Sequence, residues 1–203
     1  MINKYPCINI YENRKKNSKL SSQILYGEKF SITKIYRRFY KIKTGYDKYV
    51  GFIKKRKFEQ FTFKPTHKVS SLKACVFSKP NKNSRIKMKL SFASVLQVKS
   101  SNKEFFNFDN YWIQKSDVVP INYKEKIFKR IKIFRNIKYK WGGKKFDGID
   151  CSGLVQLFYK FNNLFCPRDT GPQFKYFKKL KSIKKDAIFF GKVMLLYVYQ
   201  KKN

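Results

Sequence analysis

Two stretches of the chain alternate apolar and polar residues with the period of two that is typical of β-strands. Within residues 5–63, four short segments follow this pattern, with turn residues between them at Gly27 and 44–47; they are 23–26, 29–35, 39–43 and 49–53. Residues 67–117 repeat the plan, with segments at 72–77, 90–98, 105–108 and 111–113. The pattern predicts two small β-barrels in tandem, joined at Lys64-Pro65-Thr66.

The last third of the chain shows helical spacing instead. Residues 124–136 carry apolar side chains on one face among lysines and arginines, which predicts an amphipathic helix. After the turn Tyr139-Lys140-Trp141-Gly142-Gly143, the segment Asp150-Cys151-Ser152-Gly153 leads into an apolar run that predicts a second helix. We therefore expect an α+β chain with domains at 1–63, 66–118 and 122–203.

Charge changes this picture less than its size suggests. The 203 residues include 48 Lys or Arg and 12 Asp or Glu, a net charge of +36, and such an excess attracts nucleic acids and other polyanions. However, the over-used residues Lys, Asn, Ile, Phe and Tyr are all encoded by codons of A and T, and Ala occurs only three times. Base composition therefore explains the charge without a selected nucleic-acid partner.

Other features exclude further classes. No apolar run is long enough for a transmembrane helix, and residues 1–6 lack the apolar core of a signal peptide, so we expect a soluble cytoplasmic protein. The four cysteines, at positions 7, 75, 151 and 166, are widely spaced without a CxxC pair, which fits neither a disulfide framework nor a zinc site. We expect no metal or other cofactor.

Cys151 is the residue to which the pattern gives a chemical role. An Asp-Cys-Ser-Gly sequence before an apolar helix places the thiol at a helix N-terminus, where the dipole and backbone N–H groups favour the nucleophilic thiolate. The same N–H groups can receive an oxyanion, and Asp150 could hold a cationic substrate group. The alternative is a buried structural cysteine beside an N-capping Asp150.

The order of motifs around Cys151 resembles one family. Residues 139–143, 150–156 and 166–170 read Tyr-x-Trp-Gly-Gly, Asp-Cys-Ser-Gly-Leu-Val-Gln and Cys-Pro-Arg-Asp-Thr, and this series is similar to the NlpC/P60 cell-wall cysteine peptidases. Residues 25–28 and 49–53 resemble the bacterial SH3-like domains that precede the peptidase in some members. The resemblance implies two small SH3-like β-barrels followed by an incomplete papain-like α+β domain, and cleavage of γ-D-glutamyl–diamino acid bonds in murein peptide fragments.

The resemblance also implies roles for individual residues. Cys151 matches the nucleophile, whereas Asp150 and Ser152 match residues around the free amine and the γ-D-glutamyl group of the peptide. Tyr139 matches an aromatic residue near the oxyanion. The loop after the catalytic helix contributes three further matches, Arg168, Asp169 and Thr170. Two more, Glu28 and Tyr49, lie in a wall of the first barrel, which would admit only peptides with a free L-Ala end.

A peptidase of this kind needs a histidine to take the proton of the thiol. The only histidine of the sequence, His67, lies upstream of Cys151 at the junction of the two predicted barrels. The family's catalytic histidine instead lies downstream, in the strand after a Gly-Asp-Leu-Ile-Phe-Trp motif. We therefore expect His67 to be a linker or surface residue and the site to lack its base.

The last residues of the sequence suggest an explanation for the missing base. Residues 185–190, Lys-Asp-Ala-Ile-Phe-Phe, match the Gly-Asp-Leu-Ile-Phe-Trp strand, and residues 191–203 match nothing. One permissible A/T-biased coding of residues 191–201, with a T restored near Phe190, gives Trp-Lys-Gly-His-Val, which contains the missing histidine. We expect a frameshift, either a real mutation or a sequencing error in a run of one base, that truncates the domain after about residue 190 and leaves the 203-residue chain weakly active or inactive.

Three functions remain open on the sequence alone. The first is a cysteine peptidase, and the second is a non-catalytic protein that binds murein peptides through an inactive peptidase domain. The third, an anion or nucleic-acid binder, is suggested by the charge alone.

Overall fold

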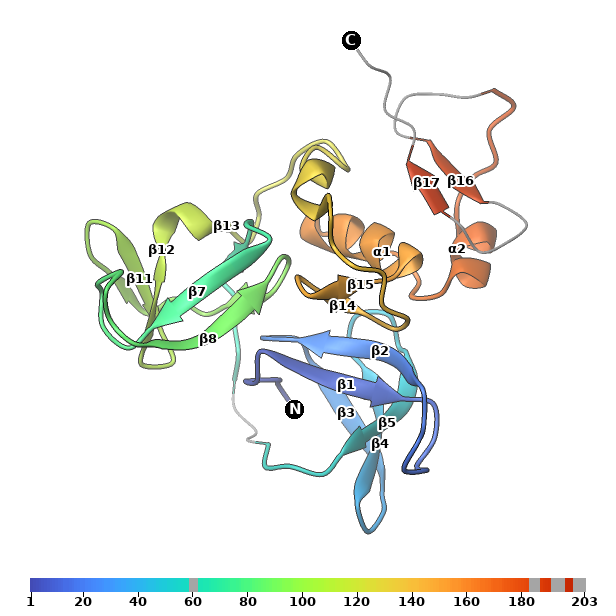
Figure 1. The fold of residues 1–203 in the computed structure, drawn as a ribbon, viewed down its shortest axis with the longest axis horizontal. Helices are drawn as coiled ribbons and strands as arrows, with labels where there is room; N and C mark the ends of the chain where they lie inside the picture. The colour runs from blue at the N-terminus through green and yellow to red at the C-terminus, as the bar shows by residue number, and fades with distance from the viewer. Residues whose placement is uncertain (59–61, 183–186, 191–195, 199–203) are drawn as a thin grey trace.

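The computed structural model describes residues 1–58, 62–182, 187–190 and 196–198. In this part of the chain, strands predominate, and two α-helices and two short 3-10 helices lie in the second half. Figure 1 shows a sheet near the N-terminus, a second group of strands beside it, and a C-terminal group around α1 that lies next to both. None of the helices described is long and apolar enough to cross a lipid bilayer.

The first sheet is antiparallel and has the strand order β2-β1-β5-β4-β3. Its inner face is lined by alternate residues of the strands, among them Ile10, Ile42 and Ile53, which are fully buried in one apolar cluster. The segments predicted from alternation overlap β2 to β5, and β1 precedes them. The strands are β1 (Cys7–Tyr11), β2 (Leu20–Leu25), β3 (Phe30–Ile35), β4 (Phe39–Thr44) and β5 (Val50–Lys54).

The second group contains a five-stranded sheet, β10-β11-β12-β7-β8, and a three-stranded sheet, β13-β6-β9. The described pairings leave the first sheet and both of these open. The strands are β6 (His67–Val69), β7 (Lys73–Phe77), β8 (Ile86–Ser91), β9 (Val95–Leu96), β10 (Ser100–Ser101), β11 (Phe105–Phe108), β12 (Tyr111–Gln114) and β13 (Val118–Pro120), with the 3-10 helix η1 (Lys115–Asp117) before β13.

The predicted strand at 90–98 is broken in the middle. β8 ends at Ser91, and Ala93 has a φ of +63°, in the left-handed region that interrupts a strand. The break turns Phe92 out of the second group and into the C-terminal core, where its ring stacks on Phe161 with centroids 4.5 Å apart. Tertiary packing therefore overrides the local alternation at this point.

The C-terminal group is built around α1 (Cys151–Phe161). The apolar face of α1 is buried against Phe92 and Phe128, whose rings lie 5.4 and 5.3 Å from that of Phe158. The other elements are η2 (Ile131–Phe134), β14 (Lys144–Lys145), β15 (Gly148–Ile149), α2 (Thr170–Tyr176), β16 (Ile188–Phe190) and β17 (Leu196–Val198). β16 and β17 pair in antiparallel fashion.

The predicted helix at 124–136 is wrong. Only the four residues of η2 are helical there, and Phe128 and Asn136 both have left-handed φ angles, +68° and +69°. Phe128 and Phe134 instead reach the core separately, as side chains of an irregular segment. The apolar residues at helical spacing pack against α1 from an irregular segment and not from a continuous helix.

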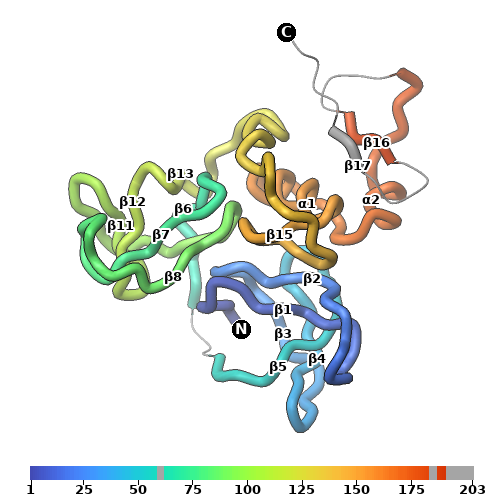
Figure 2. Tube along the Cα trace, viewed as in Figure 1, coloured from blue at the N-terminus to red at the C-terminus, as the bar shows by residue number. Residues whose placement is uncertain are grey.

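Buried polar contacts attach both sheet groups to the C-terminal group, which the tube in Figure 2 shows next to both of them. From the second group, Lys68 is buried and its Nζ donates to the carbonyl oxygen of Tyr123 at 2.6 Å and to that of Phe161 at the end of α1. From the first sheet, Gln23 Oε1 accepts the backbone N–H of Lys144 at 2.7 Å. Cys151 therefore lies at the end of a helix held by both sheet groups.

Candidate active site around Cys151

Cys151 is the first residue of α1, and Asp150 is its N-cap. Asp150 has an extended backbone, and its Oδ1 accepts the N–H of Gly153 at 2.7 Å, as an N-capping aspartate does. This cap begins the helix at the cysteine and places the half-buried thiol at the positive end of the helix dipole. The sulfur lies 3.9 Å from the hydroxyl of Thr170, the first residue of α2.

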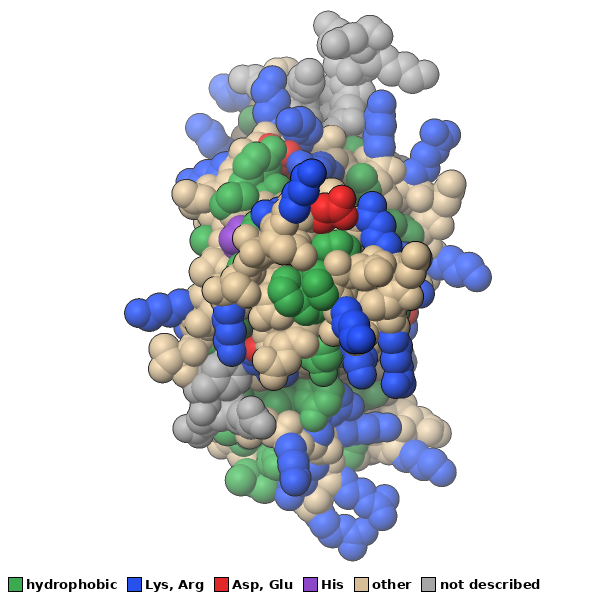
Figure 3. Space-filling model, turned by 90° about the vertical axis from the view of Figure 1, so that its left-hand side faces the viewer, with side chains coloured by type: hydrophobic (Ala, Val, Ile, Leu, Met, Phe, Trp, Pro, Cys, Tyr) green, Lys and Arg blue, Asp and Glu red, His purple; other side chains and the backbone are tan. Residues whose placement is uncertain are grey.

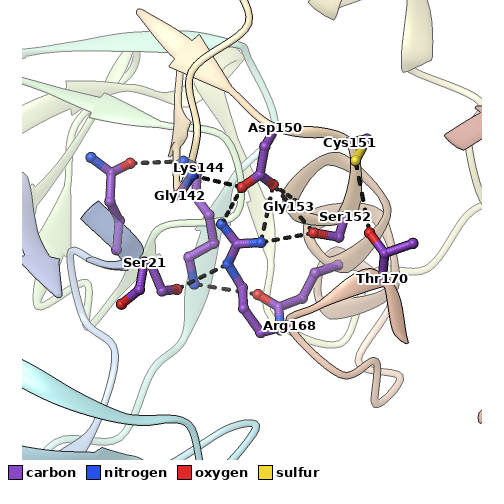
Figure 4. Close-up of polar contacts among 12 residues, drawn as sticks. Ser21, Gly142, Lys144, Asp150, Cys151, Ser152, Gly153, Arg168 and Thr170 are labelled. Atoms are coloured by element: carbon purple, nitrogen blue, oxygen red, sulfur yellow. Dashed lines mark hydrogen bonds and ion pairs between the residues drawn. The ribbon is translucent and has the colours of Figure 1, made fainter. Parts of the chain in front are cut away.

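The carboxylate of Asp150 is fully engaged, as Figure 4 shows. Besides the Gly153 N–H, it accepts the N–H of Gly142 at 2.8 Å and two N–H groups of Arg168 at 3.0 and 2.7 Å. The bond to Gly142 fixes the turn before the cavity, where Gly142 has a φ of +70°. Asp150 therefore joins the turn, the helix start and Arg168.

Arg168 lies behind Asp150 and is 3% exposed. It also donates to the hydroxyls of Ser152 and Ser22, at 2.9 and 3.0 Å. A bidentate arginine–carboxylate pair with further hydrogen bonds from the same guanidinium is a rigid arrangement. Arg168, which the resemblance placed at the substrate, thus supports the site from within the protein.

A cavity of about 290 Å³ opens above the sulfur. One wall comes from the first sheet and the turns beside it, and the other from the C-terminal group. The lining residues are Glu12, Ser21 and Tyr49 on the first side, and Tyr139, Trp141, Asp150, Cys151, Ser152, Asp169 and Thr170 on the second.

The cavity brings together seven of the nine residues that the sequence singled out. Arg168 and Glu28 are outside it. Three lining residues were missed: Trp141 lies in the aromatic-Gly-Gly motif, which could have indicated it, whereas Glu12 and Ser21 carry no local signal. Their position depends on how the first sheet packs against the C-terminal group.

Glu28 is buried between the first sheet and the C-terminal group. It contacts Lys160 of α1 at 2.5 Å and Lys144 of β14 at 3.8 Å. Burial acts to raise the pKa of Glu28, but the two lysines outweigh it and hold the pKa below its ordinary value. Glu28 therefore holds the two parts together, and the acidic side chain that the first sheet presents to the cavity is Glu12.

The cavity is acidic in a strongly basic chain. Glu12 and Asp169 are exposed at its rim. Burial of its carboxyl raises the pKa of Asp169, an effect that neighbouring Arg168 opposes. Burial also raises the pKa of Tyr49 and of Tyr139, and for Tyr139 the charges of Cys151 and Asp150 add to it. Both phenols therefore stay protonated as hydrogen-bond donors near neutral pH.

His67 does not line this cavity. It lies on β6, its ring is 4.4 Å from that of Phe106, and its Nδ1 is 3.0 Å from the hydroxyl of Thr66. Burial lowers the pKa of His67. Of residues 185–203, to which the frameshift hypothesis applies, residues 185–186, 191–195 and 199–203 lie outside the described part of the chain.

Comparison with known proteins finds a family match in the C-terminal part of the chain. Residues 136–203 match the NlpC/P60 family. A gamma-D-glutamyl-L-lysine dipeptidyl-peptidase of Bacillus subtilis (strain 168) is 28% identical over 176 aligned residues, which cover 77% of this chain and 58% of that protein. A protein of the same name from Bacillus cereus is 31% identical over 75 residues, covering 33% of this chain and 22% of the relative. The chain thus spans less than two thirds of the length of these relatives.

A crystal structure of an NlpC/P60 family protein from Bacillus cereus ATCC 10987 has a similar fold. The TM-score is 0.80 at 17% sequence identity, and the similarity covers 98% of this chain and 87% of that protein. The likeness extends beyond the matched segment to both sheet groups. Residues 136–203 thus match the NlpC/P60 family, and the fold of the described chain is similar to that of an NlpC/P60 family protein.

Proposed function

We propose that this chain is a cysteine peptidase that cleaves γ-D-glutamyl–diamino acid bonds of murein peptides, with Cys151 as the nucleophile. The observation that carries the proposal is the position of Cys151, at the start of α1 and at the base of an acidic cavity. The names of the relatives support the substrate class. We also propose that residues 1–63 and 66–118 are SH3-like domains in front of a peptidase domain at 122–203.

The reaction would be an acyl transfer. The Cys151 thiolate attacks the γ-carbonyl carbon, and the oxyanion forms at the helix N-terminus, where backbone N–H groups point outward. The carbon–nitrogen bond then breaks, a proton goes to the leaving amine, and a γ-glutamyl thioester remains on the sulfur. Water hydrolyses this thioester and restores the thiol.

The wall from the first sheet would bind the amino end of the peptide. Glu12 supplies a carboxylate for the ammonium group, and the Tyr49 hydroxyl can donate to the substrate. The cavity holds about 290 Å³, a size that suits a short peptide with a free amino end. Glu12 thus takes the role that the sequence suggested for Glu28.

The proton acceptor is the part of the mechanism that these 203 residues leave open. His67 does not line the cavity, and loss of the base of a nucleophile–base pair costs on the order of 10⁴ to 10⁶ in rate. We therefore propose that the 203-residue polypeptide turns over slowly. We retain a lost T near codon 190 as the cause, which the nucleotide sequence of codons 188 to 192 tests: without a shortened T-run, the idea fails.

Alkylation tests the site without requiring turnover. We expect iodoacetamide to modify Cys151 faster than Cys75, which is also half-buried, because the Cys151 sulfur lies at the start of α1 and lines the cavity. L-Ala-γ-D-Glu should protect Cys151, and N-acetyl-L-Ala-γ-D-Glu should not, since acetylation removes the ammonium group. Equal rates at the two cysteines, without protection, would overturn the proposal.

A non-catalytic murein-peptide-binding protein is the second candidate, because His67 lies away from the cavity. It predicts the same protection by L-Ala-γ-D-Glu. Release of lysine from L-Ala-γ-D-Glu-L-Lys, lost in Cys151→Ala, distinguishes the peptidase from the binding protein.

A further inference from the structure

Gln156 forms hydrogen bonds with the two segments that carry the walls of the cavity. It lies in the second turn of α1 and is fully buried. Its Nε2 donates to Asp47 Oδ2 at 2.8 Å and to the carbonyl oxygen of Cys166 at 3.1 Å. Asp47 belongs to the turn before β5, whereas Cys166 begins the segment that leads to α2. One amide group thus uses both of its hydrogens to hold two segments that are far apart in sequence.

The contact with Asp47 governs the Tyr49 wall. The backbone N–H of Tyr49 donates to Thr44 Oγ1 at 2.8 Å and to Asp47 Oδ1 at 3.3 Å, and the Thr44 hydroxyl in turn donates to the same Asp47 oxygen. Lys48, between Asp47 and Tyr49, has a φ of +59°, in the left-handed region that is unfavourable for a residue with a side chain. The carboxylate therefore holds in place a strained turn that presents Tyr49 to the cavity.

The hydrogen bond from Gln156 to the carbonyl oxygen of Cys166 holds the segment that carries the opposite wall. Asp169 and Thr170, which line the cavity, follow Cys166 by three and four residues. The same turn also reaches this segment directly, because the Tyr46 hydroxyl donates to the carbonyl oxygen of Leu164 at 2.6 Å. The two walls are thus fastened to each other and to α1 around Gln156.

Charges around Gln156 fix which way its amide faces. Lys144 Nζ donates to Gln156 Oε1 at 3.4 Å, so the amide oxygen faces a cation while the amide nitrogen faces the Asp47 carboxylate. Burial acts to raise the pKa of Asp47, but Lys144 and the hydrogen bonds from Thr44 and Gln156 keep it below its ordinary value. The bond between Gln156 and Asp47 is therefore assisted by charge, which makes it stronger than a hydrogen bond between neutral groups.

We propose that Gln156 is a positioning residue that sets the separation of the Tyr49 wall from the Asp169–Thr170 wall, and so the affinity for the amino end of the peptide. This inference rests on the proposed function. It assigns to Gln156 no part in the reactivity of the thiol, because the Asp150 cap and the first turn of α1 hold Cys151 independently of it.

The test compares Gln156→Met with Gln114→Met, a matched change at the end of β12 in the second group. The dissociation constant of L-Ala-γ-D-Glu is measured by protection of Cys151, and the alkylation rate is measured without peptide. We expect Gln156→Met to weaken binding at least about tenfold, the equivalent of 1.4 kcal/mol, with an unchanged alkylation rate. Gln114→Met should change neither quantity.

The pair Gln156→Glu and Asp47→Asn supplies a rescue. Gln156→Glu places a carboxylate against Asp47 and should weaken binding further, whereas Asp47→Asn in the same chain restores a donor between the two side chains. We expect the double variant to bind more tightly than Gln156→Glu. A merely structural role would lower affinity and alkylation together and show no such recovery.

Hydrogen exchange separates failure of this inference from failure of the proposed function. In Gln156→Met, the Tyr49 amide and the amides of residues 168–170 should exchange faster, while the amides of residues 153–155 stay protected. The inference would be overturned if the wild type binds L-Ala-γ-D-Glu and Gln156→Met binds it equally well. Unchanged amide exchange at both walls in Gln156→Met would overturn it too. Absence of peptide binding by the wild type would refute the proposed function, and the exchange data would still decide whether Gln156 holds the walls.

Discussion

Replacement of Arg168 by methionine should be among the most damaging single changes in the chain. The guanidinium is 3% exposed and forms two hydrogen bonds with Asp150, whose own side chain is nearly buried. Methionine fills similar volume but leaves the carboxylate with only the N–H groups of Gly142 and Gly153 and the Ser152 hydroxyl, 3.4 Å away. The variant therefore buries a negative charge without its counter-ion.

The magnitude follows from that unpaired charge. Removal of one partner of a buried ion pair costs about 3–5 kcal/mol, and the lost bonds to Ser22 and Ser152 act in the same direction. The double variant Arg168→Met, Asp150→Asn removes both charges and should recover a large part of the loss. We expect Arg168→Lys to fall between the wild type and Arg168→Met, because lysine keeps the charge but loses the bidentate geometry.

Urea unfolding followed by Trp141 fluorescence measures this effect locally, because Trp141 is adjacent to Gly142 in the turn that Asp150 holds. The background variant Trp112→Phe removes the signal of the second group. A loss below about 1 kcal/mol, the range of an exposed ion pair, would refute the reasoning. A double variant less stable than Arg168→Met would contradict it equally.

Three further changes test other parts of the fold. Gly27→Ala should destabilise the chain in urea, because Gly27 has a φ of +79° and a Cβ there would lie 2.1 Å from the carbonyl oxygen of Val95, whereas Gly171→Ala, which meets nothing within 4 Å, is the matched control. Phe92→Ala should cost about 3–5 kcal/mol, with loss of the Trp141 signal before that of Trp112 if Phe92 stabilises the C-terminal core. Lys68→Met tests the pH dependence of stability. Burial lowers the pKa of Lys68 from 10.5 to about 8, so between these pH values the folded chain releases a proton that the unfolded chain keeps. The contribution of Lys68 to the free energy of unfolding therefore increases as pH rises. The unfolding free energy of the wild type relative to Lys68→Met should therefore increase from pH 8 to 10.5, and a constant difference would refute that assignment.

Strands were predictable where one face of a sheet is buried. Period-two alternation indicated β2 to β5 because alternate residues such as Ile42 and Ile53 fill the core. The pattern failed at 124–136 and at Ala93, where Phe128 and Phe92 pack against α1. Those positions are decided by contacts with residues distant in sequence, which local spacing does not encode.

The residues of the candidate site also fall into two classes, those that a local motif indicates and those that only tertiary packing brings to the cavity. Asp150, Cys151 and Ser152 were predictable because one motif contains the cap, the thiol and the start of the helix. Glu12 reaches the cavity only through docking of the first sheet on the C-terminal group, so no local pattern indicated it.

Charge was similarly uninformative about the site. Lys and Arg side chains are scattered over the face of the molecule shown in Figure 3, without one separate basic patch. The lysines that matter for the fold are instead withdrawn from solvent and paired with carbonyl or carboxylate oxygens, as Lys68, Lys144 and Lys160 are.

The most direct test of Cys151 as a peptidase nucleophile uses a leaving group that needs no proton. The chain is incubated with the γ-(4-nitrophenyl) ester of L-Ala-D-Glu, and its mass and the modified residue are determined. We predict a burst of nitrophenolate and one L-Ala-γ-D-glutamyl group per chain, located on Cys151, absent in Cys151→Ala and strongly reduced when the alanine is N-acetylated. Acylation spread equally over Cys7, Cys75 and Cys151, or a burst that persists in Cys151→Ala, would contradict the account.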